Sequence, residues 1–250
     1  NLYTATIDGP IIPGNKNHTF FLSGERGWFL DADPHAVNLV IPSVGINTSV
    51  LPNNSANVWR FTGKTMHNFD PFTLRLSANV NTRDSRTYTH TYAKNNSEHN
   101  PLTKRENYSF SGRLSHNLSS SSFWNLNIGY KLYKNESGDG VWFDNIEAYG
   151  DTTANAPYLT IQGSRVTLDK VQLFFGKGRV SNSYSKIHNS SLNVDVDFTS
   201  QIDNHLIEVG GGLQYNTLRI YTLAPVVVAL DKDTKSLQER IAIDRKSTRL

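Results

Sequence analysis

In the stretch Gly9–Glu25, GPIIPGNKNHTFFLSGE, a turn-rich segment over residues 9–17 lies between two strand-like runs, LYTATID before it and TFFLSGE after it. The turn-forming residues of this segment include Pro13 and Gly14. Proline has no N–H to donate to a neighbouring strand, and glycine lets the backbone reverse direction. We therefore predict a sharp turn between a strand over residues 2–9 and a second over residues 17–28. Whether this hairpin belongs to a soluble β-protein or to the rim of something larger depends on the rest of the chain.

Alternation of apolar and polar side chains recurs along the 250 residues. In Phe72–Val80, for example, Leu74 and Leu76 fall on one side of an extended chain, and Arg75 and Ser77 fall on the other. A period of two residues is the pattern of a strand with one apolar face and one wet face. The sequence predicts eight strands, over residues 2–9, 17–28, 56–66, 72–83, 107–117, 122–134, 187–199 and 205–221.

The links between these strands are alternately short and long. Short links cover residues 10–16, 67–71, 117–121 and 200–204. Long links cover residues 29–55, 84–106 and 135–186, and the tail after Tyr221 is again long. In an antiparallel sheet this arrangement places every short link at one end. It is typical of transmembrane barrels, which have short periplasmic turns and long extracellular loops.

This pattern predicts an all-β fold, an antiparallel up-and-down transmembrane β-barrel of which about eight strands are present. Aromatic residues near the strand ends are expected to form the girdles at the two membrane interfaces. These residues are Trp28, Trp59, Phe69, Phe123, Trp124, Phe198 and Tyr215. A soluble all-β protein with one wet face produces the same alternation, so periodicity alone leaves that alternative open.

The composition excludes several other classes of protein. The chain has no cysteine, which rules out disulfide frameworks and thiol catalysis. Its net charge of +3 is spread along the chain, so no nucleic-acid partner is expected. The longest apolar run, Ala224–Leu230, is far shorter than the roughly 20 residues of a transmembrane helix. Because no signal peptide is visible and residue 1 falls within a strand-like run, we expect an internal piece of a longer protein.

Three stretches resemble TonB-dependent outer-membrane receptors, in the branch that often carries a carboxypeptidase-regulatory-like domain before the plug. Gly9–Glu25 is similar to the Gly-Gly-Pro-Ile-Pro turn, polar link and aromatic strand near the start of such barrels, although Asp8 replaces one glycine. LPNNSANVWRFTGKTMHNF (Leu51–Phe69) resembles the strand that follows. HLIEVGGGLQYNTLRIYT (His205–Thr222) resembles a later, glycine-rich strand. The three stretches occur in the order that the family shows.

The resemblance implies a barrel of about 22 strands with an N-terminal plug in its lumen. It implies a location in the outer membrane of a Gram-negative-type bacterium and contact with outer-membrane lipid. The energy-coupling TonB protein would be reached through the plug region, which lies outside this sequence. Residues 1–243 would then be part of the barrel. The last seven residues, DRKSTRL (residues 244–250), break the pattern and are expected to be either a basic loop or a non-native tail.

No catalytic motif is recognisable, and we expect neither an enzyme nor a cofactor. The chain contains no Gly-x-Ser-x-Gly or His-Glu-x-x-His sequence. Gly210–Gly212 lacks the Lys-Ser/Thr of a phosphate loop and is expected to lie in a strand that another backbone or a plug approaches closely. Glu136, Asp139, Asp144 and Glu147 do not have the spacing of an EF-hand, so no metal site is predicted.

Aromatic residues in the long links are the candidate ligand-binding residues: Tyr88, Tyr92, Trp142, Phe143, Tyr149 and Tyr158. Aromatic side chains offer a large contact area at low entropic cost, which suits recognition loops. An equally good interpretation is that they pack the loops together. Residues 164–178 alternate enough to suggest a hairpin extension.

The expected function is therefore a share in energy-coupled uptake, in which extracellular loops bind a large, scarce solute of unidentified chemistry. A passive porin-like channel is the first alternative. A secreted β-rich carbohydrate-binding or adhesion module is the second.

Overall fold

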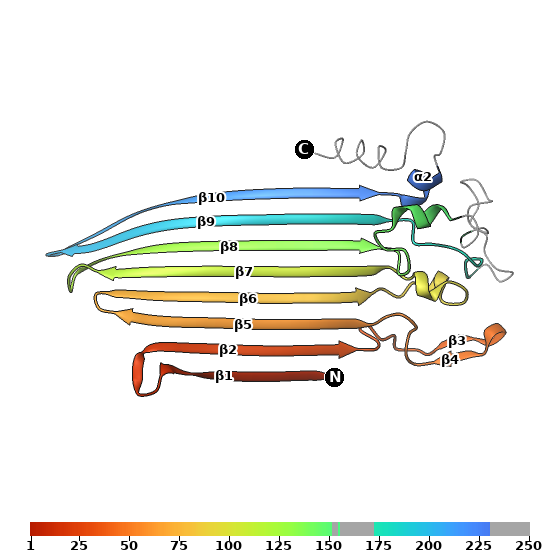
Figure 1. The fold of residues 1–250 in the computed structure, drawn as a ribbon, viewed down its shortest axis with the longest axis horizontal. Coiled ribbons are helices and arrows are strands. Elements are labelled where there is room, and N and C mark those ends of the chain that lie inside the picture. Colours follow the sequence, from red (N-terminus) through yellow and green to blue (C-terminus); the bar gives the residue numbers. More distant parts are fainter. Residues whose placement is uncertain (152–154, 156–172, 231–250) are drawn as a thin grey trace.

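The computed structural model describes residues 1–151, 155 and 173–230, and it is all-β with one short helix among them. Eight antiparallel strands form one sheet (Figure 1). They are β1 (Leu2–Ile12), β2 (Asn15–Phe29), β5 (Ala56–Phe69), β6 (Phe72–Arg86), β7 (Leu102–Asn117), β8 (Ser122–Gly138), β9 (Tyr184–Ile202) and β10 (His205–Leu223). All eight predicted strands are confirmed, and most extend a few residues further than predicted.

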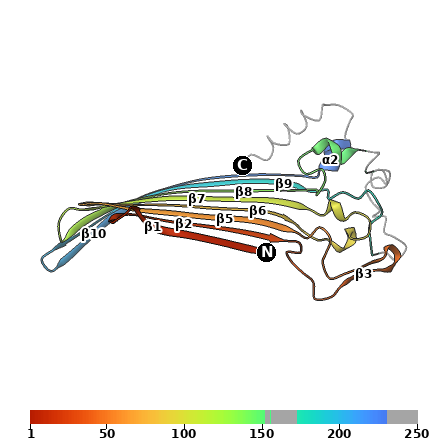
Figure 2. The same cartoon turned by 60° about the horizontal axis from the view of Figure 1, so that its bottom comes forward.

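The order of strands in the sheet follows the chain, β1-β2-β5-β6-β7-β8-β9-β10. The four tight turns therefore lie together at one end, and the long links lie at the other, as predicted (Figure 1). Pro13 and Gly14 form the first of these turns, between β1 and β2. Gly14 has a φ of +83°, a conformation that favours glycine. Figure 2 shows the sheet as a single curved layer.

The long links contain short elements of their own. The link after β2 holds the hairpin β3 (Leu39–Ile41) and β4 (Ile46–Thr48) with the 3-10 turn η1 (Pro42–Val44) between them. The link after β6 holds η2 (His90–Tyr92) and η3 (Ser97–His99), the link after β8 holds η4 (Ile146–Gly150), and α2 (Pro225–Leu230) follows β10. None of the described helices is long and apolar enough to cross a membrane.

Two sequence-based expectations fall mainly outside the described residues. Most of the proposed hairpin extension, residues 164–172, is in this category, and the described remainder, 173–178, belongs to none of the named strands. The tail at residues 244–250 also lies outside the described part of the chain.

The strand register assigns every side chain of the sheet to one of two faces, because directly paired residues point to the same side. Leu76 of β6 pairs with Thr65 of β5 and Gly112 of β7, and the same row continues through Ile128 of β8 to Val194 of β9. This is the apolar face. The neighbouring row, which contains Arg75, belongs to the polar face.

The buried hydrophobic side chains lie at the long-link end of the molecule and not under the sheet. Three small clusters are centred on Leu39, Ile146 and Tyr149. By contrast, residues in the middle of the apolar face remain exposed, for example Leu76 at 45% and Ile128 at 45%. No layer of described residues covers this face, which is unusual for so large an apolar surface.

The described sheet is open. β1 pairs only with β2 and β10 pairs only with β9 among the strands of the sheet, so closure into a barrel is not observed. Among the described residues, the structure therefore shows an all-β antiparallel sheet with two free edges.

Candidate functional site

The apolar face carries a band of apolar side chains that involves all eight strands and is interrupted on β5 by Thr65 and Gly63. Along β6 the band runs from Phe72 to Val80, a length of about 27 Å at the usual rise of an extended strand. On a strand tilted by the usual angle of about 35–45°, this length projects to about 19–22 Å, which is comparable to the outward apolar band of outer-membrane barrels at about 25 Å. The band is therefore of a size that matches the hydrocarbon layer of a membrane.

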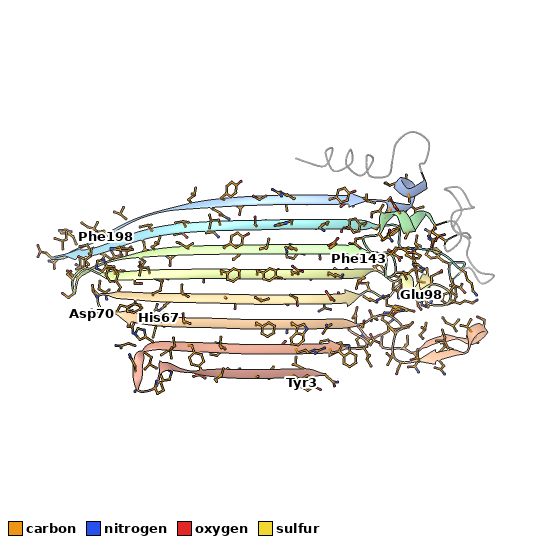
Figure 3. The ribbon with its side chains drawn as sticks, viewed as in Figure 1. Tyr3, His67, Asp70, Glu98, Phe143 and Phe198 are labelled. Carbon is orange, nitrogen blue, oxygen red and sulfur yellow. The ribbon has the colours of Figure 1, made fainter. Side chains whose placement is uncertain are left out.

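Aromatic and histidine side chains border the band near the tight turns. His18 and His67 are cross-strand neighbours whose Nδ1 atoms lie 3.2 Å apart. Phe72 stacks on His116 with 4.1 Å between ring centroids, and the indole N–H of Trp124 donates to Nδ1 of His116. Figure 3 shows the short-turn end of the sheet, with His67, Asp70 and Phe198 labelled.

A second aromatic border lies toward the long links. The register places Tyr3, Trp59, Tyr108, Tyr130 and Tyr215 on the apolar face. The guanidinium of Arg26 lies 4.5 Å above the ring of Trp59, on the same face. Rings with an apolar body and a polar edge suit the boundary between hydrocarbon and head groups.

One of the predicted girdle residues, Phe123, lies on the polar face and not on the apolar face. Phe123 pairs with Asn117 and Thr199, so its side chain points to the polar face. The adjacent Trp124 points to the apolar face. Two consecutive aromatic residues of a strand always point to opposite sides, so only one of this pair contributes to the apolar border.

The polar face contains a hollow of about 530 Å³ that crosses the sheet from β2 to β9. Residues on this face that line it include Lys64, Arg75, Arg113, Asn127 and Asp195. Beside the hollow, Ser115 donates to Asn125 Oδ1, and Nδ2 of Asn125 donates to Asp197. The middle of this face is therefore mainly polar, whereas the middle of the opposite face is mainly apolar.

The long links are held together by a buried carboxylate, Asp139, which follows β8. It accepts hydrogen bonds from the ring of His99 at 2.8 Å and from the backbone N–H groups of Val141, Trp142 and Ser181. Three separate segments of chain therefore converge on one side chain. Arg86 adds a further link by donating to the carbonyl oxygens of Glu98 and Gly140.

Two of the predicted ligand-binding residues are buried within this loop assembly. Tyr149 is fully buried; its hydroxyl donates to the carbonyl oxygen of Phe143 and accepts from the N–H of Asp139. Burial raises the pKa of Tyr149 well above its ordinary value. Tyr92 is also buried and donates to the carbonyl oxygen of Val180. The structure records a packing role for both rings.

The remaining predicted ligand-binding residues also make contacts within the loops. Tyr88 packs beside the cluster centred on Leu39, and burial raises its pKa. Trp142 is half-buried against Tyr149 and Val180. Phe143, labelled in Figure 3, lies under the ammonium of Lys104. Tyr158 lies outside the described residues.

Ligand binding by these six aromatics stays a prediction. The acidic residues in the same region have internal partners: Asp139 as above, and Glu136 with Tyr184 and Lys186. No group of three or more potential metal ligands occurs in the described part of the chain.

Sequence reasoning missed the His99–Asp139 contact and the placement of Arg75 beside Arg113. Neither has a local signal, because the partners are far apart in sequence. The pairing of Arg75 with Arg113 becomes visible only once the register of β6 with β7 is known.

Comparison of the chain with protein-family models, with curated proteins and with solved structures finds no match in any of the three.

Proposed function

We propose that this chain forms part of the wall of an outer-membrane transporter, with the apolar face toward lipid and the polar face toward an aqueous lumen. The observation that carries the proposal is the uncovered apolar band bordered on both sides by aromatic residues. In water, such a surface exposes at least one large hydrophobic side chain on every strand of the sheet. In a bilayer, the same side chains are in their preferred environment.

Closure of the wall is a requirement of this proposal. Unpaired backbone groups at a sheet edge are costly in hydrocarbon, so strands that cross a membrane form closed barrels. The edges of β1 and β10 need further strands, which we propose belong to a larger barrel.

We also propose energy-coupled uptake of a solute through a plugged barrel, as in TonB-dependent receptors. This proposal rests on the resemblance to that family of three stretches, Gly9–Glu25, Leu51–Phe69 and His205–Thr222.

The test compares two arginine substitutions at consecutive positions of β6. Leu76 points to the middle of the apolar band and Ser77 points to the polar face. Leu76→Arg should lower the stability of the lipid-inserted form by about 2–4 kcal/mol, the usual effect of a cation at the bilayer midplane. Ser77→Arg should change it by less than about 1 kcal/mol, because lumen-facing substitutions avoid the hydrocarbon.

The measurement is folding from denaturant into lipid vesicles of the larger barrel to which this chain is proposed to belong, followed by circular dichroism and protease protection. Two results together support the proposed membrane wall. The sheet should form only when lipid is present, and Leu76→Arg should lower its stability more than Ser77→Arg does. A cooperatively folded, monomeric sheet in plain buffer without detergent would reject it and favour a secreted β-rich module.

A further inference from the structure

The charges on the polar face are separated by strand. On the four central strands, β5 to β8, every charged side chain that the register assigns to this face is a cation. These cations are Arg60, Lys64, Arg75, Arg83, Arg105, Arg113 and Lys131. The acidic residues of the same face lie on the outer strands, with Asp195 and Asp197 on β9.

Two pairs of arginines are directly opposite each other in the ladder between β6 and β7. Arg75 pairs with Arg113, and Arg83 pairs with Arg105. Like charges in directly opposed positions destabilise a sheet, so this arrangement has a cost in the absence of a counter-charge. Among the described residues, neither Arg75 nor Arg113 takes part in an ion pair or a side-chain hydrogen bond.

The nearest acidic residue in the same row forms no ion pair with either arginine in the part of the chain that the structure describes. Asp195 lies on β9, two strands away from Arg113 on β7, with Asn127 of β8 between them. The backbones of these two strands are about 10 Å apart, and no ion pair joins Asp195 to Arg113 in the described part of the chain. Both arginines line the hollow of the polar face together with Lys64, Ser77 and Ser111.

We propose that this hollow binds a solute that carries two or more oxyanion groups, either carboxylates or phosphates. The planar guanidinium presents paired N–H donors that match the two oxygens of such a group. An oxyanion between Arg75 and Arg113 would remove their mutual repulsion. The hydroxyl groups of Ser77 and Ser111 lie two rows away on the same face, with their oxygens 2.6 Å apart. One of them donates to the other, which leaves one hydroxyl proton as a further donor. This inference deepens the proposed function, on which it rests, by naming the class of solute.

The test measures binding of citrate and of pyrophosphate to the full chain by titration calorimetry at low salt, in micelles or in plain buffer, whichever supports the sheet. The wild-type chain should bind at least one of these anions and not the neutral sugar maltose. Arg75→Gln/Arg113→Gln should weaken that binding at least about tenfold, because two charge-assisted donor pairs are lost.

The matched control removes the same charge from the opposite face. Arg26 and Arg219 both lie on the apolar face. Arg26→Gln/Arg219→Gln should therefore alter anion affinity by less than about twofold at equal ionic strength. Arg75→Lys/Arg113→Lys serves as the second variant should the glutamine pair fail to fold, and it should weaken binding because lysine lacks the paired donors.

Equal losses in the two glutamine variants would mean that overall charge attracts the anion, and would overturn the inference. Absence of citrate and pyrophosphate binding by the wild-type chain would overturn it as well. A preference for citrate or for pyrophosphate would identify the oxyanion as carboxylate or phosphate. Failure of lipid insertion with anion binding intact would reject the membrane wall alone, whereas insertion without selective binding would reject the oxyanion site alone.

Discussion

The imidazole of His99 lies 2.8 Å from the carboxylate of Asp139, 40 residues further along the chain. The side chain of Asp139 is fully buried. Its carboxylate also accepts hydrogen bonds from the backbone N–H groups of Val141 and Ser181. Buried carboxylates are tolerated when hydrogen bonds replace the water they have lost. This carboxylate therefore joins the link after β6 to the long link between β8 and β9.

Asp139→Ala should loosen the long-link end without unfolding the sheet. The change leaves several buried donors unpaired, which corresponds to a loss of about 2–4 kcal/mol in local stability. Hydrogen exchange should show faster exchange at the N–H groups of Val141, Trp142 and Ser181. Asp144→Asn, at an exposed position of the same link, is the control and should leave these rates unchanged. Unchanged exchange in Asp139→Ala would show that the carboxylate does not hold the loops.

Tyr149 should make the loop assembly sensitive to alkaline pH. Burial raises the pKa of its hydroxyl in the folded protein above the value of about 10 in the unfolded chain. Between these two values the folded form retains a proton that the unfolded form has lost. The stabilising contribution of the neutral hydroxyl is therefore complete below pH 10 and declines as the pH rises above it.

The measurement for Tyr149 is local hydrogen-exchange stability of the loop assembly from pH 8 to pH 11, corrected for the intrinsic exchange rate. Tyr149→Phe should flatten the alkaline decline and lower stability at pH 8 by about 1–2 kcal/mol, because the bond to the Phe143 carbonyl oxygen is lost. Tyr3→Phe, an exposed tyrosine of β1, should retain the decline. The same decline in Tyr149→Phe as in the wild type would assign it to another group.

Three of the four tryptophans should report their depth in a bilayer. Trp59 and Trp124 lie at the two borders of the apolar band, whereas Trp142 belongs to the loop assembly. In variants that retain one tryptophan, lipids brominated near the head group should quench Trp59 and Trp124 more strongly than lipids brominated at the chain end. Trp142 should be quenched by neither lipid. Strong quenching of Trp124 by lipids brominated at the chain end would contradict its assignment to the border of the apolar band near the tight turns.

Most of the sheet was predictable because its signals are local. A strand with one apolar face shows the two-residue period within its own sequence, and Phe72–Val80 is a clear example. Turn residues such as Pro13-Gly14 mark where strands stop. The predicted ends were less accurate near the long links, because charged residues such as Lys104 and Glu106 occupy the apolar-face positions there and interrupt the pattern.

The candidate site was much less predictable. Tyr88, Tyr92, Trp142, Phe143 and Tyr149 lie in the long links, as predicted. Their sequence does not distinguish a ring that contacts a ligand from a ring such as Tyr149 that fills the loop interior. That difference depends on which segments converge on Asp139. The sequence also did not show to which face Phe123 belongs. A shift of a single position along a strand moves a side chain to the opposite face.

The sequence by itself determined the strands, the alternation of short and long links and the division of side chains into an apolar and a polar set, since each of these follows from neighbouring residues. Only the tertiary structure decided which residues of different strands meet: Arg75 with Arg113 across one ladder, and His99 with Asp139 across the loops. Register and loop convergence are set by contacts between segments tens of residues apart, and no period within a single strand encodes them.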